Sequence, residues 1–227
     1  MVVKEGTTIG EKAFYVNRGL TSITFPEGLT TIGEMAFGWC TNLTSVVLPS
    51  TLTTIENEAF ARCTGLASLT FPEGLTAIGL LAFYGCTGLT SVTLPEGLKT
   101  IGIRAFLACD ELVSVDFSQA VNLTTIEEYA FNGCRGLTSD ATFFPEGLTT
   151  IGEHAFSGCG GLTSLTFPKG LKTIGKGAFY GCIYLTSVTF EGSTTTIGKE
   201  AFYACRGLAS STFPQGYFLE LPDYCLK

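Results

Sequence analysis

Cysteine and histidine are the residues of this chain best suited to nucleophilic or metal chemistry. The chain has nine cysteines and one histidine in 227 residues. Eight cysteines, from Cys40 to Cys205, recur at intervals of 23 or 25 residues, so they lack the close pairing of a zinc site. Cys159 follows His154 by five residues, but it is only one of eight equivalent cysteines. We therefore predict no enzymatic activity, no metal and no cofactor.

The cysteines also raise the question of disulfides. Eight of them occupy one column of a repeat, so their Cα–Cβ bonds should run side by side rather than face one another. We predict buried free thiols that act as small apolar side chains with a weak S–H donor. Asn17 stands in this column in the first copy, and Cys225 lies outside it.

The repeat that carries the cysteines organises the whole chain. An Ala-Phe pair occurs nine times, from Ala13-Phe14 to Ala201-Phe202, with Ile four residues before each Ala. One unit reads L-T-S-V-T-F-P-E-G-L-T-T-I-G-E-x-A-F-x-G-C-T-G. A unit this short cannot bury its own apolar side, so successive units must stack into a solenoid.

The unit beginning at Leu89 illustrates the expected elements. Residues 89–94 alternate apolar and hydroxyl side chains and end at a proline, which indicates a strand that pairs in parallel with its copies about 4.8 Å away. Residues 95–97 form a turn. Residues 98–101 form a short second extended or turned segment. Residues 102–106 form a brief helical or irregular turn that carries Ala-Phe into the core. We expect one strand per unit and little regular helix.

This unit resembles the cysteine-bearing leucine-rich repeats of the BspA-like class, whose signature is LxxIxLPxxLxxIgxxAFxxC. We expect an α/β-type repeat solenoid, a right-handed superhelix of about nine turns of 23–25 residues. A parallel sheet would form one face, and short irregular or helical turns the other. The expected single domain spans 1–227, with repeats over about 2–214 and a C-terminal cap at 215–227. The resemblance implies a bacterial or protist surface protein that binds host or matrix molecules.

Three departures from the repeat carry separate predictions. Residues 117–123 replace a five-residue turn, and Asp140-Ala141 are inserted in a strand; either is tolerated variation or a bump that shapes a binding surface. Residues 191–194 bring a threonine into a leucine column, where we expect local weakness. The chain starts within a unit, so the N-terminal end is expected to be uncapped, either because residues are missing or because it self-associates end to end or as a dimer.

Charge and hydropathy limit the partners. The net charge is −7, which argues against a nucleic-acid surface. No apolar run reaches about 18 residues, so no membrane insertion is expected. Residues 1–6 lack the features of a signal peptide. That observation favours the cytoplasm, whereas the resemblance favours the cell surface or secretion.

The first candidate surface consists of outward hydroxyls on the strands. Ordinary β-propensity and solubility explain such residues, but a regular lattice could also bind a glycan, a mineral or an ice face. At two places the columns instead hold Val47 and Asp116. The candidate ligand-binding residues are Ser22, Thr24, Ser68, Thr70, Ser91, Thr93, Asp116, Ser164, Thr166, Ser187 and Thr189.

The second candidate surface flanks the Ala-Phe pairs, where variable columns hold aromatic and arginine side chains, among them Arg62. These side chains either pack on the neighbouring unit or form a patch that binds a partner. The candidate patch consists of Trp39, Tyr84, Arg104 and Leu107. The predicted function is a non-catalytic binding and adhesion module for a protein or glycan. The alternative is an ice- or crystal-surface-binding protein that uses the Thr/Ser columns.

Overall fold

The computed structural model describes residues 7–138, 144–193 and 195–208. Within these ranges the chain forms 16 short strands and no helix. Nine strands centre on the Thr-Ile pair of each unit and pair in parallel, always with the equivalent residue of the next coil. They are β1 (Thr8–Ile9), β3 (Thr31–Ile32), β5 (Thr54–Ile55), β7 (Ala77–Ile78), β9 (Thr100–Ile101), β11 (Thr125–Ile126), β12 (Thr150–Ile151), β14 (Thr173–Ile174) and β16 (Thr196–Ile197).

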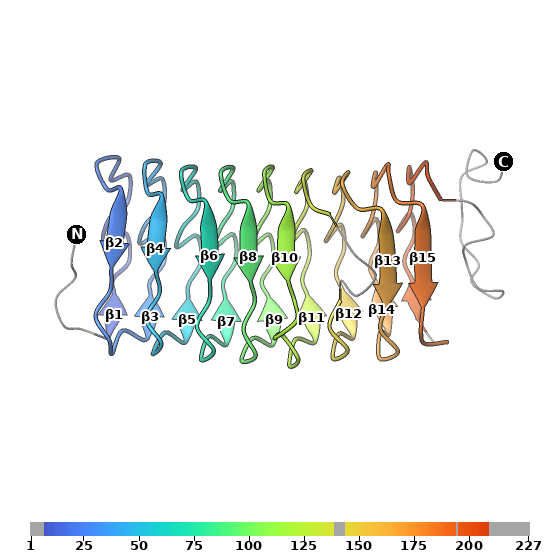
Figure 1. The fold of residues 1–227 in the computed structure, drawn as a ribbon, viewed down its shortest axis with the longest axis horizontal. Helices are drawn as coiled ribbons and strands as arrows, with labels where there is room; N and C mark the ends of the chain where they lie inside the picture. The colour runs from blue at the N-terminus through green and yellow to red at the C-terminus, as the bar shows by residue number, and fades with distance from the viewer. Residues whose placement is uncertain (1–6, 139–143, 194, 209–227) are drawn as a thin grey trace.

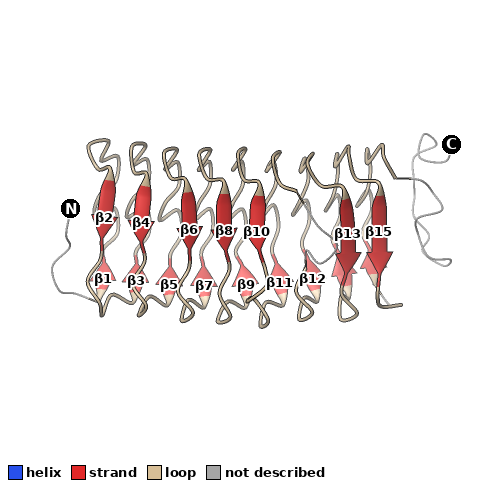
Figure 2. Ribbon diagram, in the orientation of Figure 1, coloured by secondary structure: helices blue, strands red, loops and turns tan. Residues whose placement is uncertain are grey.

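A second set of strands lies along another face of the same stack (Figure 1). These strands form three separate parallel sheets, β2-β4, β6-β8-β10 and β13-β15 (Figure 2). They are β2 (Ser22–Thr24), β4 (Ser45–Val47), β6 (Ser68–Thr70), β8 (Ser91–Thr93), β10 (Ser114–Asp116), β13 (Ser164–Phe167) and β15 (Ser187–Phe190).

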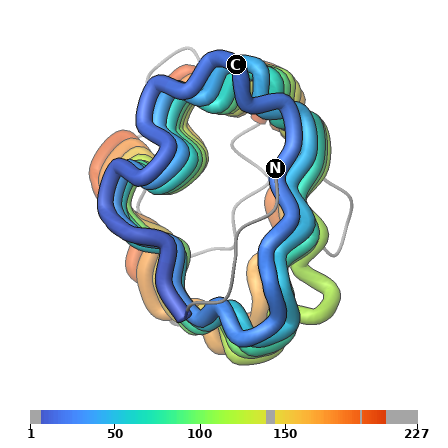
Figure 3. Tube along the Cα trace, turned by 90° about the vertical axis from the view of Figure 1, so that its left-hand side faces the viewer, coloured from blue at the N-terminus to red at the C-terminus, as the bar shows by residue number. Residues whose placement is uncertain are grey.

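The predicted stack of coils is confirmed, with two corrections. Most units contain two strands rather than one, and the longest continuous sheet is the one centred on Thr-Ile. The sequence analysis did not predict this sheet, because a two-residue strand shows too little periodicity; each strand between β1 and β16 pairs with copies on both sides. The turns were expected to be helical or irregular; in the part of the chain that the structure describes they are irregular, so the solenoid is built from strands and turns alone. Figure 3 shows the coils superposed along the stack.

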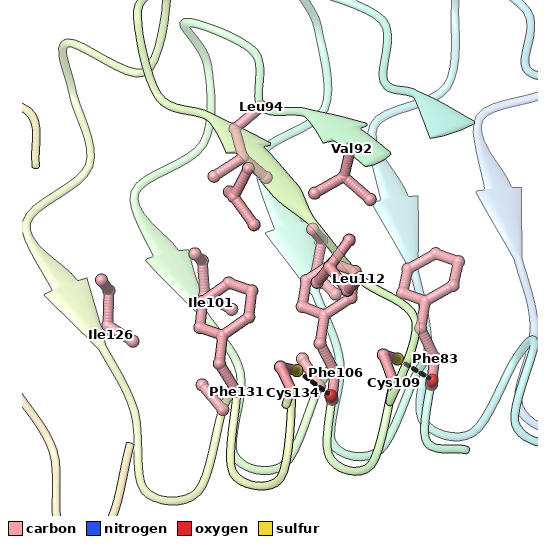
Figure 4. Packing of buried hydrophobic residues seen from close by; sticks show 14 of the residues in the cluster. Phe83, Val92, Leu94, Ile101, Phe106, Cys109, Leu112, Ile126, Phe131 and Cys134 are labelled. Atoms are coloured by element: carbon pink, nitrogen blue, oxygen red, sulfur yellow. Dashed lines mark hydrogen bonds between the residues drawn. The ribbon is translucent and has the colours of Figure 1, made fainter. Parts of the chain in front are cut away.

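The Ala-Phe pairs form the centre of the core. Nine phenylalanines, from Phe14 to Phe202, stack in one file, with neighbouring ring centroids 5.1–5.4 Å apart and ring planes within 13° of parallel. From Phe37 to Phe179 these rings are fully buried, together with the Ala, Leu and Ile columns around them. Burying one such ring stabilises the fold by about 1.5–3 kcal/mol. Figure 4 shows part of this core.

The cysteine column forms a second internal file. Each of the eight described thiols is free and buried, and its Sγ donates to the main-chain oxygen of the phenylalanine one coil earlier, at 3.1–3.3 Å. Figure 4 shows two of these bonds, from Cys109 to Phe83 and from Cys134 to Phe106. The prediction of buried free thiols is confirmed for these residues; Cys225 lies outside the described ranges.

The Ala-Phe turns are joined by a further set of main-chain hydrogen bonds. The N–H of Phe37 donates to the oxygen of Ala59 at 2.8 Å, and the same bond recurs from coil to coil. This geometry places two residues per unit at positive φ: the one before Ala at 51–58°, and the one before the cysteine column at 57–76°. Glycine occupies the second position in four copies, which indicates a positive φ there, although the sequence analysis made no such prediction.

The departures from the repeat have local explanations. The loop at 117–123 projects from the stack (Figure 3), and it begins with the Ser118 N–H donating to Asp116 Oδ1 at 2.8 Å. In the later unit the threonine of the leucine column is residue 194, which lies outside the described residues; the next residue, Thr195, is buried, and its hydroxyl donates to the Leu171 oxygen at 2.9 Å. The insertion at 140–141, the start of the repeats at 2–6, residue 194 and the cap at 215–227 lie outside the described residues.

Candidate binding surfaces

The predicted ligand-binding hydroxyls all lie on the outward side of the second strand set. Each strand alternates an inward apolar residue with outward positions, as in β6, where Leu69 is buried between the exposed Ser68 and Thr70. Register keeps equivalent residues adjacent, so Thr70 lies beside Thr93 and Thr93 beside Asp116. The surface differs from the prediction in one respect: among the described residues β4 is not paired with β6, so the hydroxyl columns are interrupted there.

A groove of about 610 Å³ lies at the first interruption, between β4 and β6. Its apolar part includes Val47, whose side chain is 67% exposed in a column that otherwise holds mostly Thr. Its polar part includes Ser68, Thr70 and Glu73. The remaining lining residues are Val46, Leu48, Ser50, Phe71 and Pro72.

The turn that follows β4 also departs from the repeat. Ser50 and Thr51 replace the usual Glu-Gly, and both bond to the preceding coil. Ser50 Oγ donates to Glu27 Oε2 at 3.0 Å, and Thr51 Oγ1 donates to the Leu29 oxygen at 2.8 Å. Both bonds join this coil to its N-terminal neighbour, with which β4 pairs, whereas β4 is not paired with β6.

Asp116 has a structural role that the sequence did not suggest. Its carboxylate accepts the Ser118 N–H and so shapes the start of the projecting loop. This contact explains why a carboxylate replaces threonine at the end of β10, without requiring a ligand.

The predicted partner patch is divided into two groups by the structure. Trp39 and Tyr84 are brought together by Arg62, whose guanidinium carbon lies 5.5 Å from the Trp39 ring centroid and 4.4 Å from that of Tyr84. Arg62 stood in the variable columns of the sequence but was not selected for the patch. Its central role depends on the direction of its side chain across the neighbouring coil, which periodicity does not reveal.

Arg104 belongs to a second group, where its guanidinium carbon lies 5.0 Å from the Tyr129 ring centroid. Tyr129 stacks in turn on His154, at 5.2 Å between centroids, and His154 meets Tyr180 edge-on. Leu107 is half-buried in the same coil as Arg104. Tyr129 was not among the predicted patch residues, although it stands in the same column as Arg104, directly before Ala.

The one histidine and its nearest cysteine in sequence serve different parts of the fold. The His154 ring stacks on Tyr129, whereas the Cys159 thiol is buried and donates to the Phe131 oxygen. Burial raises the pKa of the Cys159 thiol, while a nucleophilic cysteine requires a lowered pKa. No group of three potential metal ligands occurs among the described residues. Nor do those residues form a helix of the length and hydropathy that a membrane crossing requires.

Comparison with known families agrees with this architecture. The family model described as "BspA type Leucine rich repeat region (6 copies)" matches residues 7–138 and 124–227. The chain therefore belongs to the BspA-type leucine-rich repeat family, and the resemblance drawn from the repeat is confirmed. Members typically act as non-enzymatic binding or surface scaffolds. No curated protein matches the chain.

Solved structures of bacterial leucine-rich repeat proteins are similar over most of the chain. One from Bacteroides ovatus ATCC 8483 is 30% identical with a TM-score of 0.75, covering 92% of this chain and 62% of its own. A leucine-rich cell surface protein from Faecalibacterium prausnitzii A2-165 is 28% identical with a TM-score of 0.65, covering 91% and 66%. One from Eubacterium ventriosum ATCC 27560, 20% identical with a TM-score of 0.54, covers 92% and 64% and supports the fold alone. The chain thus spans less than two thirds of the length of each.

Proposed function

We propose that this chain is a non-catalytic binding module, part of a cell-surface adhesin, that recognises a protein or glycan through the groove between β4 and β6. The main observation behind this proposal is the groove. It is an open surface groove whose lining combines apolar side chains with a few polar groups, as ligand sites do. The surface location is proposed from the family and from the similar cell surface protein.

The groove also differs from the rest of the strand face in its chemistry. Val47 exposes an apolar side chain at a position where β6 and β8 present threonines. The exposed apolar side chain offers contact area to a ligand, and the neighbouring hydroxyls and carboxylate can orient that ligand through hydrogen bonds.

A glycan array and a pull-down from matrix extracts, each with purified protein, test this function. Val47→Asp places a charge in the groove and should reduce capture at least tenfold. Val113→Asp, at an exposed valine away from the groove, is the matched control and should leave capture unchanged. Equal capture by both variants, or no capture by the parent chain, would contradict the proposal.

A second candidate function, ice or crystal-surface binding, is favoured by the continuous sheet. Threonine occupies the outward position of eight of its nine strands, and Ala77 occupies the ninth. The spacing between neighbouring strands is about 4.8 Å. The hydroxyls of Thr31, Thr54 and Thr100 have no hydrogen-bond partner among the described residues. This column is more regular than the interrupted hydroxyl columns of the second strand set.

Thermal hysteresis at millimolar protein concentration tests the second candidate. Hysteresis that disappears in Thr100→Lys would support it. Absence of both hysteresis and crystal shaping would remove it and leave the groove-based function standing.

A further inference from the structure

We propose that Trp39, Arg62 and Tyr84 form a second site, separate from the groove, that binds the carboxylate of an acidic glycan such as a uronic acid chain. These residues lie on three successive coils beside the Ala-Phe turns. None of them lines the groove. The site therefore does not depend on the function proposed above.

The guanidinium of Arg62 is held in position by its neighbours. It lies between the rings of Trp39 and Tyr84, and its Nη2 donates to the Tyr84 hydroxyl. Gly85 makes room for the side chain: a Cβ at that position would lie 2.9 Å from Arg62 Cδ. The stacked guanidinium is thus ordered before any ligand arrives, which reduces the entropy lost on binding.

This cation lacks an internal counter-charge. The salt bridges found among the described residues involve Lys12, His154, Lys176 and Lys199, and none includes Arg62. Arg62 Nε is moreover buried with no hydrogen-bond partner. A carboxylate matches the forked guanidinium better than a neutral oxygen does.

Trp39 and Arg62 occupy backbone positions with positive φ, where glycine is the more stable residue. Trp39 and Arg62 both stand directly before the cysteine column, at φ values of 63° and 62°. Four other units have glycine in this column. A non-glycine residue in this conformation is less stable by about 1 kcal/mol. Two consecutive large side chains that meet each other here are therefore not explained by backbone stability.

The exposed rings favour a sugar over an acidic peptide. Tyr15 and Trp39 are each 43% exposed, and the Tyr15 ring lies against Gly38, where a Cβ would be 3.0 Å away. Tyr15, Trp39, Arg62 and Tyr84 thus belong to four successive coils, about 4.8 Å apart from coil to coil. The C–H faces of a pyranose pack on aromatic rings, and a uronic acid carries its carboxylate on the same residue. An acidic peptide side chain supplies only the charge.

Trp39 is the only tryptophan of the chain, so its fluorescence reports on this site directly. Titration with an oligogalacturonate should give a saturable change in emission. The methyl-esterified oligosaccharide should bind at least tenfold more weakly, because it lacks the carboxylates. Arg62→Gln should weaken binding of the acidic form by a similar factor, whereas Arg104→Gln, with the same change in net charge, should not.

Several outcomes would overturn the proposal. The first two are a parent chain whose emission shows no saturable change, and an Arg62→Gln variant that binds oligogalacturonate as tightly as the parent. The other two are an Arg104→Gln variant that loses as much affinity as Arg62→Gln, and a parent chain that binds poly-L-glutamate as tightly as oligogalacturonate. Thermal unfolding followed by circular dichroism establishes that Arg62→Gln is folded. Tyr84→Phe keeps the ring but removes the hydroxyl that holds the guanidinium, so a smaller loss is expected there. Val47→Asp should leave this titration unchanged, which separates failure here from failure of the groove.

Discussion

At the scale of single residues, the cysteine column shows how a reactive side chain becomes a structural one. Each described thiol is enclosed by its own copies and by the Phe main chain, and its proton is directed to a carbonyl oxygen. Burial, the largest cause, raises the pKa of Cys63, Cys86 and Cys109 well above the ordinary value. These thiols therefore remain protonated in the folded chain, where they act as small apolar groups with one donor.

The raised thiol pKa values predict that the fold weakens in alkali. The folded thiols keep their protons above about pH 9, whereas the thiols of the unfolded chain lose theirs, so the unfolded state is favoured as the pH rises. Each buried thiol should remove about 1.4 kcal/mol per pH unit in this window. The free energy of unfolding in urea, measured from pH 7.5 to 10.5, gives this slope.

Cys109→Ala isolates the thiol contribution from that of other alkaline groups. The variant should be less stable than the parent at pH 7.5, because it loses the bond to the Phe83 oxygen. Its stability should nevertheless fall less steeply above pH 9. Parallel pH profiles for the variant and the parent would show that the buried thiols are not responsible.

At the scale of elements, the phenylalanine file joins coils whose strands are too short to hold together alone. The strands of the continuous sheet have two residues each, so their hydrogen bonds contribute little without the rings stacked behind them. Neighbouring rings are nearly parallel, and each ring in the middle of the file contacts a ring on both sides. This arrangement makes stability depend on position along the stack.

Truncation of a ring should therefore cost more in the middle of the file than at its end. Phe106→Ala removes a fully buried ring with two stacked neighbours and should lower the free energy of unfolding by about 3–5 kcal/mol. Phe14→Ala removes a partly buried ring with one stacked neighbour and should cost less. Chemical denaturation of both variants measures the difference. Equal losses would mean that the file does not act as one packed unit.

At the scale of the whole molecule, the chain is close to one-dimensional, because each coil contacts mainly the coils beside it. Eight successive pairings connect the nine strands of the continuous sheet, always between equivalent residues. One coil can therefore be removed without changing the contacts that the others make, provided that the register is preserved.

Deletion of residues 152–174 tests this property. The 23-residue deletion joins Ile151 to Gly175 and restores the Ile-Gly sequence of the unit. The shortened chain should fold, with a urea m-value about one tenth lower than that of the parent, because the m-value scales with the surface exposed on unfolding. Deletion of residues 163–174 removes only half a coil and should abolish cooperative unfolding. A parent-like transition in that control would contradict the coil-by-coil architecture.

The amino-acid sequence by itself determined the stacked coils, the inward columns and the burial of the cysteines. It could do so because, in a repeat, the neighbour of each inward residue is its own copy, as between Phe83 and Phe106. The tertiary structure alone decided where the strand face opens and which outward side chains meet. The groove lies where β4 and β6 are not paired, and the meeting of Arg62 with Tyr84 depends on a positive-φ backbone and on the space above Gly85. Such contacts join unlike residues on different coils, so periodicity carries no information about them.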